Sequence, residues 1–350
     1  MKKKQWTIGL AWLMIFSLLV LFPRELAQAQ VKPVILKYSD PSKAGTARTD
    51  AAKDTMLEIE KRTGGRVKHE FYWAESLVKA KDALDAIKAG TCEVGGAPNV
   101  VYHPARFPVW QFSNLMFLGG SDIWGVIKAW NEMAVTNAKL KEELDKQGLK
   151  FLSSFGYPST IICKKPLAEP GDFKGLKIRA VGPTAKWVSA VGATPVPLTF
   201  YEVTEALARG VVDGTVGYLY VHFTYKFHDY CKYLTYTPVA NTFIFDTWIN
   251  LDTWKKLPRD IQKIYEETWR EYYPQAVIKH CDEEIATLLK VFKDAGGKIV
   301  ELTPDQYAKW RNSAAFLVDD YSKKMSSMGV DALKIIEEFE RLYKKYERKK

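Results

Sequence analysis

Residues 173–214 read FKGLKIRAVGPTAKWVSAVGATPVPLTFYEVTEALARGVVDG. Short runs of branched apolar residues alternate in this stretch with segments of helical spacing, and each helical segment ends at a glycine, a common helix stop. The predicted order is strand, helix, strand, helix and strand, at Leu176–Ala180, Thr184–Val191, Thr194–Leu198, Tyr201–Arg209 and Val211–Asp213. Strands that alternate with helices indicate crossover units and mainly parallel pairing.

The same alternation occurs nearer the N-terminus. The predicted elements are a strand at 34–38, a helix from Thr49 or Asp50 to the glycines at 64–65, a strand at 67–73, a helix at 79–89 and a short strand at 92–95. Ligands on sheets of this kind bind at the carboxyl ends of the strands, where loops and helix N-termini converge. A small-molecule site is therefore expected at those ends.

The chain from Pro258 onward has an almost entirely helical and charged pattern. It includes a stretch from Asp260 to Val291, and at about 1.5 Å per residue such a helix is suited to span two lobes. No low-complexity linker or internal repeat separates the two alternating regions. If the chain forms two lobes, strands that cross between them are therefore expected to join them.

The first thirty residues have the pattern of a segment that directs export. A basic start at 1–4 precedes an apolar run from Ile8 to Phe22, and Ala27-Gln28-Ala29 is a small-x-small cleavage site. This is the three-part plan of a secretory signal peptide, and the apolar run is short for a membrane span of about twenty residues. We predict a signal peptide at 1–29 that is removed and a periplasmic mature protein, with an uncleaved membrane anchor as the alternative.

The chain carries a formal net charge of +10, and part of the excess lies in the C-terminal segment 341–350. A basic cluster can bind nucleic acid, but it is also typical of a solvated helix end, where cations complement the helix dipole. Because the chain has the pattern of an exported protein, we predict no nucleic-acid partner. Mild positive charge would still help to attract anionic solutes.

Motifs of catalytic and metal sites are missing from the sequence. Its five histidines lie outside zinc-binding patterns, its four cysteines form no C-x-x-C pair, and neither a G-x-S-x-G elbow nor a phosphate-binding loop occurs. We therefore predict no metal, no cofactor and no enzyme activity, with an exported enzyme that acts on carboxylates as the weaker alternative. The cysteines are expected to be buried free thiols, although a disulfide is an alternative in an oxidising compartment.

Aromatic side chains are abundant, with 11 Trp, 18 Tyr and 17 Phe, and several clusters follow predicted strands. Most aromatic residues pack in cores, but aromatic walls with a few directed polar groups also describe a small-molecule cleft. The clusters are Tyr72-Trp73, Tyr102, Phe155-Gly156-Tyr157, Phe200-Tyr201 and Tyr218-Leu219-Tyr220.

An ordered series of motifs gives the sequence a family resemblance. The series comprises EKRTGGRV at 60–67, ALDAIKAG at 83–90, FKGLKIR at 173–179, VGATPVPL at 191–198, GVVDG at 210–214, KYLT at 232–235 and NLDTWKKLP at 250–258. Together these motifs resemble the DctP-type solute-binding subunits of tripartite ATP-independent periplasmic (TRAP) transporters. The resemblance covers roughly residues 34–340.

The resemblance implies an α/β fold of two lobes, like that of type II periplasmic binding proteins, with mixed sheets joined by crossing strands and a long lobe-spanning helix. We expect lobe I at 30–154 plus 243–283, and lobe II with the C-terminal helices at 155–242 plus 284–350. The resemblance also implies a solute held between the lobes and a partnership with membrane permease subunits driven by an ion gradient. A periplasmic sensor subunit that presents its ligand to a receptor is the alternative.

The resemblance also assigns roles to individual residues. In the family, the arginine of the K-I-R strand pairs with the ligand carboxylate, which gives this role to Arg179. A guanidinium offers a planar fork of donors that matches a carboxylate, although an arginine at a strand end is otherwise often part of a surface ion pair. Phe200 matches an aromatic position that packs against the bound solute. The other candidates on the cleft wall are Trp73, Tyr102, Phe155, Gly217, Tyr218, Thr242 and Phe245.

Two departures from the family pattern bear on the ligand. Many members have Glu-Asn-Pro shortly after V-D-G, with the asparagine reaching the ligand, whereas Gly217 and the bulky Tyr218 occupy this region here. Members that bind sialic or related acids have a further arginine before the K-I-R strand, and residues 155–160 contain none. Fewer polar anchors and more aromatic wall favour a monocarboxylate with an apolar or aromatic body over a polyhydroxylated or dicarboxylate ligand.

Two further expectations concern a metal and the oligomeric state. The branch of the family that holds a 2-oxo acid through a cation has an acidic residue after V-D-x, and this chain has none between Asp213 and Asp229. A metal-assisted site is therefore not expected. We predict a monomer, with a dimer through Leu333, Ile336 and Phe339 as the alternative, because these three residues fall at helical spacing.

Overall fold

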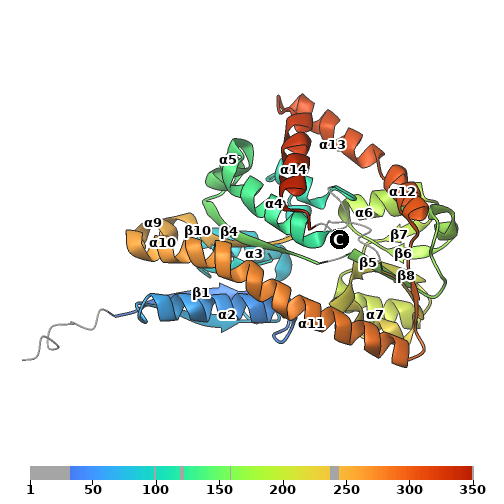
Figure 1. Cartoon of the computed structure of the whole chain (residues 1–350), viewed down its shortest axis with the longest axis horizontal. Helices are drawn as coiled ribbons and strands as arrows, with labels where there is room; N and C mark the ends of the chain where they lie inside the picture. The colour runs from blue at the N-terminus through green and yellow to red at the C-terminus, as the bar shows by residue number, and fades with distance from the viewer. Residues whose placement is uncertain (1–31, 98–99, 119–121, 158, 237–243, 349–350) are drawn as a thin grey trace, which may run out of the picture. The chain divides into compact units, whose positions relative to one another are not determined.

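The computed structural model describes residues 32–97, 100–118, 122–157, 159–236 and 244–348. The predicted signal peptide at 1–29 and the candidate residue Thr242 lie outside the described residues. The chain from Ile35 onward forms one unit, in which two β-sheets are surrounded by helices (Figure 1). This is the α/β arrangement that the sequence predicts.

The first sheet has five strands in the order β2-β1-β3-β10-β4. The strands are β1 Val34–Ser39, β2 Val67–Tyr72, β3 Val94–Gly96, β4 Leu149–Gly156 and β10 Ile244–Asn250. β3 is parallel to β1, whereas β10 is antiparallel to both β3 and β4. The helices between these strands are α2 Ala47–Arg62, α3 Ala83–Ala89, α4 Ile123–Thr136 and α5 Ala138–Lys146, with short 3₁₀ turns at Ala80–Asp82, Val100–Tyr102 and Trp110–Asn114.

The second sheet has six strands in the order β11-β9-β5-β8-β6-β7. The strands are β5 Ser159–Cys163, β6 Lys177–Arg179, β7 Thr194–Val196, β8 Gly214–Tyr218, β9 Tyr233–Tyr236 and β11 Lys298–Val300. β6 is parallel to β7 and β8, whereas β5 is antiparallel to β8 and β9. Its helices are α6 Gly182–Ala190, α7 Phe200–Ala208 and α8 Leu219–Thr224, with 3₁₀ turns at Pro170–Phe173 and Phe227–Asp229.

The strands of the alternating regions pair in parallel, as predicted, since β1 is parallel to β3 and β6 is parallel to β7 and β8. Each sheet as a whole is nevertheless mixed, which confirms the mixed sheets implied by the family resemblance. The reason lies in the crossing strands. β4 of the first sheet is followed after two residues by β5 of the second. β5 follows a strand of the first sheet and joins the second, and β10 follows a strand of the second sheet and joins the first. Each of them is antiparallel to both of its neighbours.

Most predicted elements of the alternating regions agree with the observed ones to within two or three residues. The strand predicted at Val211–Asp213 is wrong, because β8 begins only at Gly214. The Asp213 N–H donates to the carbonyl O of Lys177 at 2.7 Å, and its Oδ2 accepts from the Lys177 N–H at 2.9 Å. These bonds hold residue 213 as a turn beside β6.

A long helical run confirms the helix predicted at 260–291. It comprises α10 Arg259–Glu267, a π-helical turn at Thr268–Tyr272 and α11 Tyr273–Asp294. Pro274 lies in the first turn of α11 and has no N–H to donate to the preceding turn, which the wider π-turn accommodates. α11 packs against α2 beside the first sheet and against α8 and β11 beside the second (Figure 1). It therefore links the two lobes.

The remaining helices are α9 Leu251–Lys256 and three at the C-terminus, α12 Pro304–Ser313, α13 Phe316–Ser327 and α14 Ala332–Tyr346. α14 packs against α4. Ile336 and Phe339 are buried, whereas Leu333 is exposed. Most of the apolar face considered for a dimer is therefore covered within the chain, while the lobe boundaries and the oligomeric state stay predictions.

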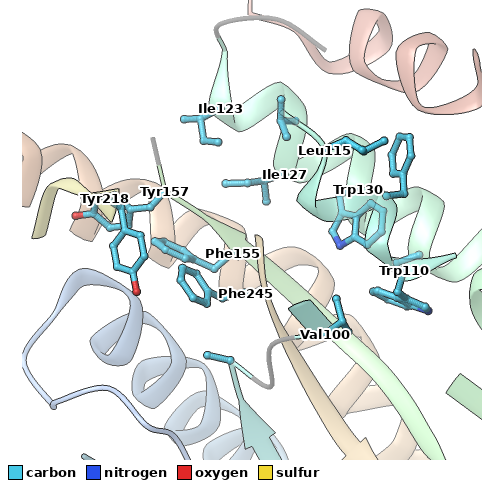
Figure 2. Close-up of a cluster of buried hydrophobic side chains, with 14 of the residues drawn as sticks. Val100, Trp110, Leu115, Ile123, Ile127, Trp130, Phe155, Tyr157, Tyr218 and Phe245 are labelled. Carbon is cyan, nitrogen blue, oxygen red and sulfur yellow. The ribbon is translucent and has the colours of Figure 1, made fainter. Parts of the chain in front are cut away.

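An aromatic core connects α4 to the crossing strands. Figure 2 shows Ile127 and Trp130 of α4 in one cluster with Phe155 of β4 and Phe245 of β10. The Phe245 ring centre is 6.4 Å from that of Phe155 and 5.2 Å from that of Tyr218. Because buried aromatic rings fix one another in place, this core supports the end of β8 from behind.

Candidate ligand-binding site

A cavity of about 160 Å³ lies between loops that follow strands of both sheets. From the first sheet, it is bordered by the segment after β1, which includes Ser42 and Thr46, and by Ala97 after β3. From the second sheet, it is bordered by Arg179 at the end of β6 and by the junction of β8 and α8. These are the carboxyl ends of the strands, where the alternating pattern predicts a ligand site.

Arg179 is the most deeply placed charge on this wall, with a residue exposure of only 2%. Its Nε donates to the carbonyl O of Leu198 at 2.7 Å, and its Nη1 donates to that of Val216 at 3.3 Å. No carboxylate of the described residues forms an ion pair with it. The guanidinium is therefore held in place by backbone carbonyls while its charge has no partner of opposite sign.

Burial lowers the pKa of Arg179 from its ordinary value, and Tyr102, Tyr218 and Glu202 act in the opposite direction. An arginine nevertheless stays protonated in a protein. The nearby Glu202 carboxylate is already bonded, because it accepts from the Thr199 N–H at 2.6 Å and from the Thr199 hydroxyl at 2.7 Å in the cap of α7. A buried cation without a paired carboxylate is costly, so this site is suited to an anion supplied from outside.

Aromatic rings form the wall around Arg179. The guanidinium carbon lies 3.9 Å from the centre of the Phe200 ring, a cation–π geometry. Phe200 meets Tyr218 edge to face at 5.4 Å and stacks on Tyr225 at 6.5 Å. Burial raises the pKa of Tyr218 well above its ordinary value, so its hydroxyl stays neutral. Together with Phe245 (Figure 2), these residues surround the one buried charge of the described cavity wall with neutral rings.

The structure brings some of the predicted site residues together and not others. Tyr102, Arg179, Phe200, Tyr218 and Phe245 line the cavity. Tyr102 comes from the first-sheet side and is half exposed at the rim. The cavity therefore has predicted residues on both of its sides.

Trp73, Phe155 and Gly217 do not line the cavity. Trp73 packs edge to face on Tyr38 at 5.3 Å, and Phe155 is completely buried. Gly217 lies behind the wall: a Cβ there would be 3.1 Å from Cε1 of His222 and 3.3 Å from the Phe200 ring. These three residues support the wall rather than form its surface.

Sequence reasoning missed several residues of the cavity wall. The signal for Ser42 and Lys43 was available, because they come directly after a predicted strand and ligands meet the carboxyl ends of strands. Tyr225 had no such signal, since nothing in its spacing separates a wall ring from a core ring. The missed residues include Ser42, Lys43, Thr46, Glu75 and Tyr225, whereas Tyr201 and Tyr220 belong to aromatic clusters that the sequence singles out.

Two larger hollows lie elsewhere on the described chain, with volumes of about 320 and 280 Å³. In the first, Lys150 pairs with Glu266 at 2.9 Å. In the second, Lys186 pairs with Asp320 at 2.9 Å. Their other charged side chains are exposed or already bonded. Neither hollow has a buried, unpaired charge like that of Arg179, so we place the ligand site in the smaller cavity.

Three further observations concern the described part of the chain. No group of three His, Cys, Asp or Glu side chains in it is placed to hold a metal ion. None of its helices combines the length and the apolar character needed to cross a membrane. The four cysteines are buried, free thiols.

Two mixed sheets joined by crossing strands, with a cavity between their strand ends and a buried arginine on its wall, define a two-lobed solute-binding protein. The chain belongs to the DctP family of bacterial extracellular solute-binding proteins, family 7, whose model matches residues 39–324. The family resemblance seen in the sequence is thereby confirmed. DctP-type proteins are the solute-binding subunits of TRAP transporters, and transport of a solute is the function of this family.

Individual relatives agree with this assignment. The C4-dicarboxylate-binding periplasmic protein DctP of Rhodobacter capsulatus is 27% identical over 316 residues, which cover 87% of this chain and 92% of that protein. A TRAP periplasmic solute-binding protein from Desulfovibrio salexigens, crystallised with the C-terminus of a symmetry mate in its ligand-binding site, is 27% identical with a TM-score of 0.76 over 91% of this chain and 98% of that one. A marine metagenome TRAP protein specific for aromatic acid ligands has a TM-score of 0.79 at 24% identity, over 90% of this chain and 100% of that one. The two-lobed fold is thus confirmed.

Proposed function

We propose that the protein captures a small organic monocarboxylate with an apolar or aromatic body and delivers it to the membrane permease subunits of a TRAP transporter. The observation that carries this proposal is Arg179, a guanidinium 2% exposed and without a carboxylate partner among the described residues. A ligand carboxylate supplies that partner through charge-assisted hydrogen bonds. These bonds strengthen as the cleft excludes water.

The size and lining of the cavity support the proposed ligand body. An apolar cavity of about 150 Å³ can hold a benzene ring, and the cavity beside Arg179 has a volume of about 160 Å³. Phe200, Tyr218 and Phe245 present ring surfaces to it. An acid with a single ring, or with an aliphatic chain of similar volume, therefore fits.

A dicarboxylate, the ligand named for the Rhodobacter relative, suits this wall less well. The other buried arginine near the wall, Arg48, is already paired with Asp40 at 2.6 Å. A second carboxylate deep in the cavity would lose its hydration without meeting an unpaired buried cation. The wall therefore favours one negative charge at the Arg179 end of the ligand.

We also propose that the protein is exported and that it binds its solute without catalysing a reaction. Residues 1–29 act as a removable signal peptide, and the mature protein works in the periplasm as a monomer. The lobes close by bending at the crossing strands and around the long helix, and the ligand drives closure through contacts that the open state lacks. The solute is released unchanged, so full recovery of intact acid after long incubation is expected, and turnover of the acid would instead favour an enzyme.

Calorimetry with benzoate and a series of short aliphatic monocarboxylates tests the proposal. We expect Arg179→Ala to weaken binding by about 2 kcal/mol or more, which is about 30-fold, because a buried charged partner is lost. Arg209→Ala is the matched control, since Arg209 is exposed and pairs only with the exposed Glu205, and its affinity should equal that of the wild type. Unchanged affinity in Arg179→Ala, or no binding of any acid of the series, would contradict the proposal.

A further inference from the structure

Two loops of the first-sheet side carry charges to the rim of the cavity. The loop after β1 brings Lys43, and the loop after β2 brings Glu75. We call these two residues the rim pair. They form no ion pair with each other, and the Lys43 ammonium bonds to no described residue beyond its contact with the Tyr225 ring. Lys43 therefore has donors free for a ligand.

A buried ion pair fixes the loop that carries Lys43. Both Nη atoms of Arg48 donate to the Asp40 carboxylate at 2.6 Å, and Nη2 also donates to the Ser42 hydroxyl at 2.6 Å. The Ser42 N–H in turn donates to Asp40 at 2.8 Å, and the Thr49 hydroxyl donates to the Lys43 carbonyl O at 3.3 Å. Lys43 therefore projects from a backbone that is held at several points, as a binding residue requires.

The loop that carries Glu75 is held in a strained conformation. Ala74 and Glu75 both have positive φ angles, 54° and 59°, which cost a residue with a side chain on the order of 1 kcal/mol or more each. The Ala74 N–H donates to the Ser42 carbonyl O at 2.9 Å, so the two loops are tied together. Glu75 itself accepts from the Ala80 N–H at 3.0 Å through Oε1, and its Oε2 accepts from the exposed Lys79 ammonium at 3.3 Å. Each oxygen keeps a further lone pair for a ligand donor. Strain of this kind persists where the surrounding structure enforces it, and it is common at ligand sites.

The rim pair and Arg179 lie at two ends of one aromatic wall. Arg179 lies over Phe200, Phe200 stacks on Tyr225, and the Lys43 Nζ is 5.6 Å from the centre of the Tyr225 ring. The bond from the Ala74 N–H to the Ser42 carbonyl O holds Glu75 beside the loop of Lys43, so its carboxylate lies at the same end of the wall as Lys43. A ligand that reaches from Arg179 along the rings therefore meets both charges of the rim pair.

We infer that the rim pair is a second polar subsite, which takes a hydroxyl group at the end of the ligand remote from its carboxylate. A hydroxyl oxygen accepts a hydrogen bond from the Lys43 ammonium while its proton is donated to Glu75. A second carboxylate would be attracted by Lys43 but repelled by Glu75, and a methyl group would use neither. The subsite thus selects hydroxy acids whose two polar groups lie at opposite ends of an apolar body, and this inference rests on the proposed function.

Calorimetry with matched acids tests the subsite. The probes are benzoate and phenylacetate, each compared with its 3-hydroxy and 4-hydroxy derivatives, and terephthalate as a dicarboxylate. We expect the wild type to bind at least one hydroxy acid about 10-fold more tightly than its parent, and to bind terephthalate no more tightly than benzoate. In Lys43→Met and in Glu75→Gln, this ratio of the two affinities should fall to about twofold or less, because each variant removes one of the two groups that bond the hydroxyl.

The variants are chosen to leave the loops intact. Met keeps the apolar stem of Lys43, and Gln keeps an oxygen that can accept from the Ala80 N–H. Lys61→Met serves as the control, because Lys61 is exposed on α2 and lies outside the cavity wall, and it should retain the full preference for the hydroxy acid.

The outcomes separate this inference from the proposed function. If the wild type binds the parent acids through Arg179 but shows no preference for a hydroxyl, the subsite is disproved and the proposed function stands. Equal loss of parent and hydroxy acid in both rim variants would also overturn the subsite, because it would reveal a general effect on the cavity. If Arg179→Ala does not weaken binding, the proposed function fails, and the subsite fails with it.

Discussion

Two arginines, Arg48 and Arg179, are buried to the same extent in this protein, and their surroundings differ in one respect. Each is 2% exposed and each lies over a phenylalanine ring. Arg48 is joined to Asp40 by two hydrogen bonds of 2.6 Å, whereas Arg179 is bonded only to carbonyl groups among the described residues. Burial alone therefore does not mark a ligand site. A buried charge without a partner of opposite sign in the chain is the feature that indicates one.

The electrostatics of the two arginines follow from this difference. Burial acts to lower the pKa of Arg48, but the charge and hydrogen bonds of Asp40 raise it well above its ordinary value. For Arg179, burial dominates and the pKa is lowered. The same degree of burial thus accompanies opposite pKa shifts. One arginine has a carboxylate partner within the chain, and the other is suited to receive one from a ligand.

The largest expected effect is on stability. Arg48→Met should lower the free energy of unfolding by about 3–5 kcal/mol, because it leaves the buried Asp40 carboxylate without a cation to balance its charge. Arg179→Met should leave the ligand-free protein as stable as the wild type or more stable, since it removes a buried charge that no carboxylate of the described residues balances. Urea denaturation of both variants measures the difference. Equal losses in the two variants would refute the distinction, and Asp40→Asn combined with Arg48→Met should recover part of the lost stability.

The two arginines also differ in how far the sequence could reveal them. Arg179 ends a strand in an ordered set of family motifs, so the family resemblance predicts a ligand-binding role for it from the sequence. The pairing of Arg48 with Asp40 depends on how the start of α2 packs on the end of β1, and no spacing rule indicates it. Phe155 was predicted on the cleft wall but lies in the core, because strand periodicity gives the face of a strand and not what covers that face.

The fold was more predictable than the site for a related reason. Alternating strands and helices are local patterns, and they placed most elements correctly. The antiparallel entry of β5 and β10 into the sheets is a long-range property, so the local pattern suggested parallel pairing instead. The rim pair depends on two loops being tied together by the bond from Ala74 to Ser42, which only the tertiary structure shows.

A partly buried carboxyl group extends the comparison, because Glu284 lies outside the cavity and has no charged partner among the described residues. Its Oε1 accepts from the Ala47 N–H at 3.2 Å at the start of α2, and its Oε2 is buried without a hydrogen-bond partner among the described residues. Burial raises the pKa of Glu284 to about 7; Asp50 adds to the rise, and the bond from Ala47 opposes it. Below about pH 7 the Glu284 carboxyl group is therefore protonated and carries no charge.

The pH dependence of stability should reveal this proton. The folded pKa of Glu284 lies above the unfolded value, so between about pH 4.5 and 7 the folded state holds a proton that the unfolded state has released. The free energy of unfolding should therefore fall as the pH rises through this range, by roughly 2 kcal/mol from this group. Glu284→Gln should flatten that slope in urea denaturation at several pH values, and an unchanged slope would show that other groups cause it.

The smallest expected effect concerns the rings beneath the two arginines. The Arg179 guanidinium carbon is 3.9 Å from the centre of the Phe200 ring, whereas that of Arg48 is 5.4 Å from the centre of Phe245. In the ligand-free protein, the Phe200 ring thus adds to the two carbonyl groups that bond a cation without a carboxylate, while the charge of Arg48 is already balanced by Asp40. A double-mutant cycle with Arg→Met and Phe→Leu isolates each pair from the packing of its members.

We expect a coupling of about 1 kcal/mol in the free energy of unfolding for Arg179 with Phe200, and less than about half of that for Arg48 with Phe245. The order matters more than the size. If the Arg48 cycle gave the larger coupling, ring contact would stabilise these arginines whether or not a carboxylate is present, and Phe200 would be ordinary packing beneath Arg179. If the Arg179 cycle gives the larger coupling, the ring holds the unpaired cation in place until a ligand carboxylate arrives, which is what a preorganised anion site requires.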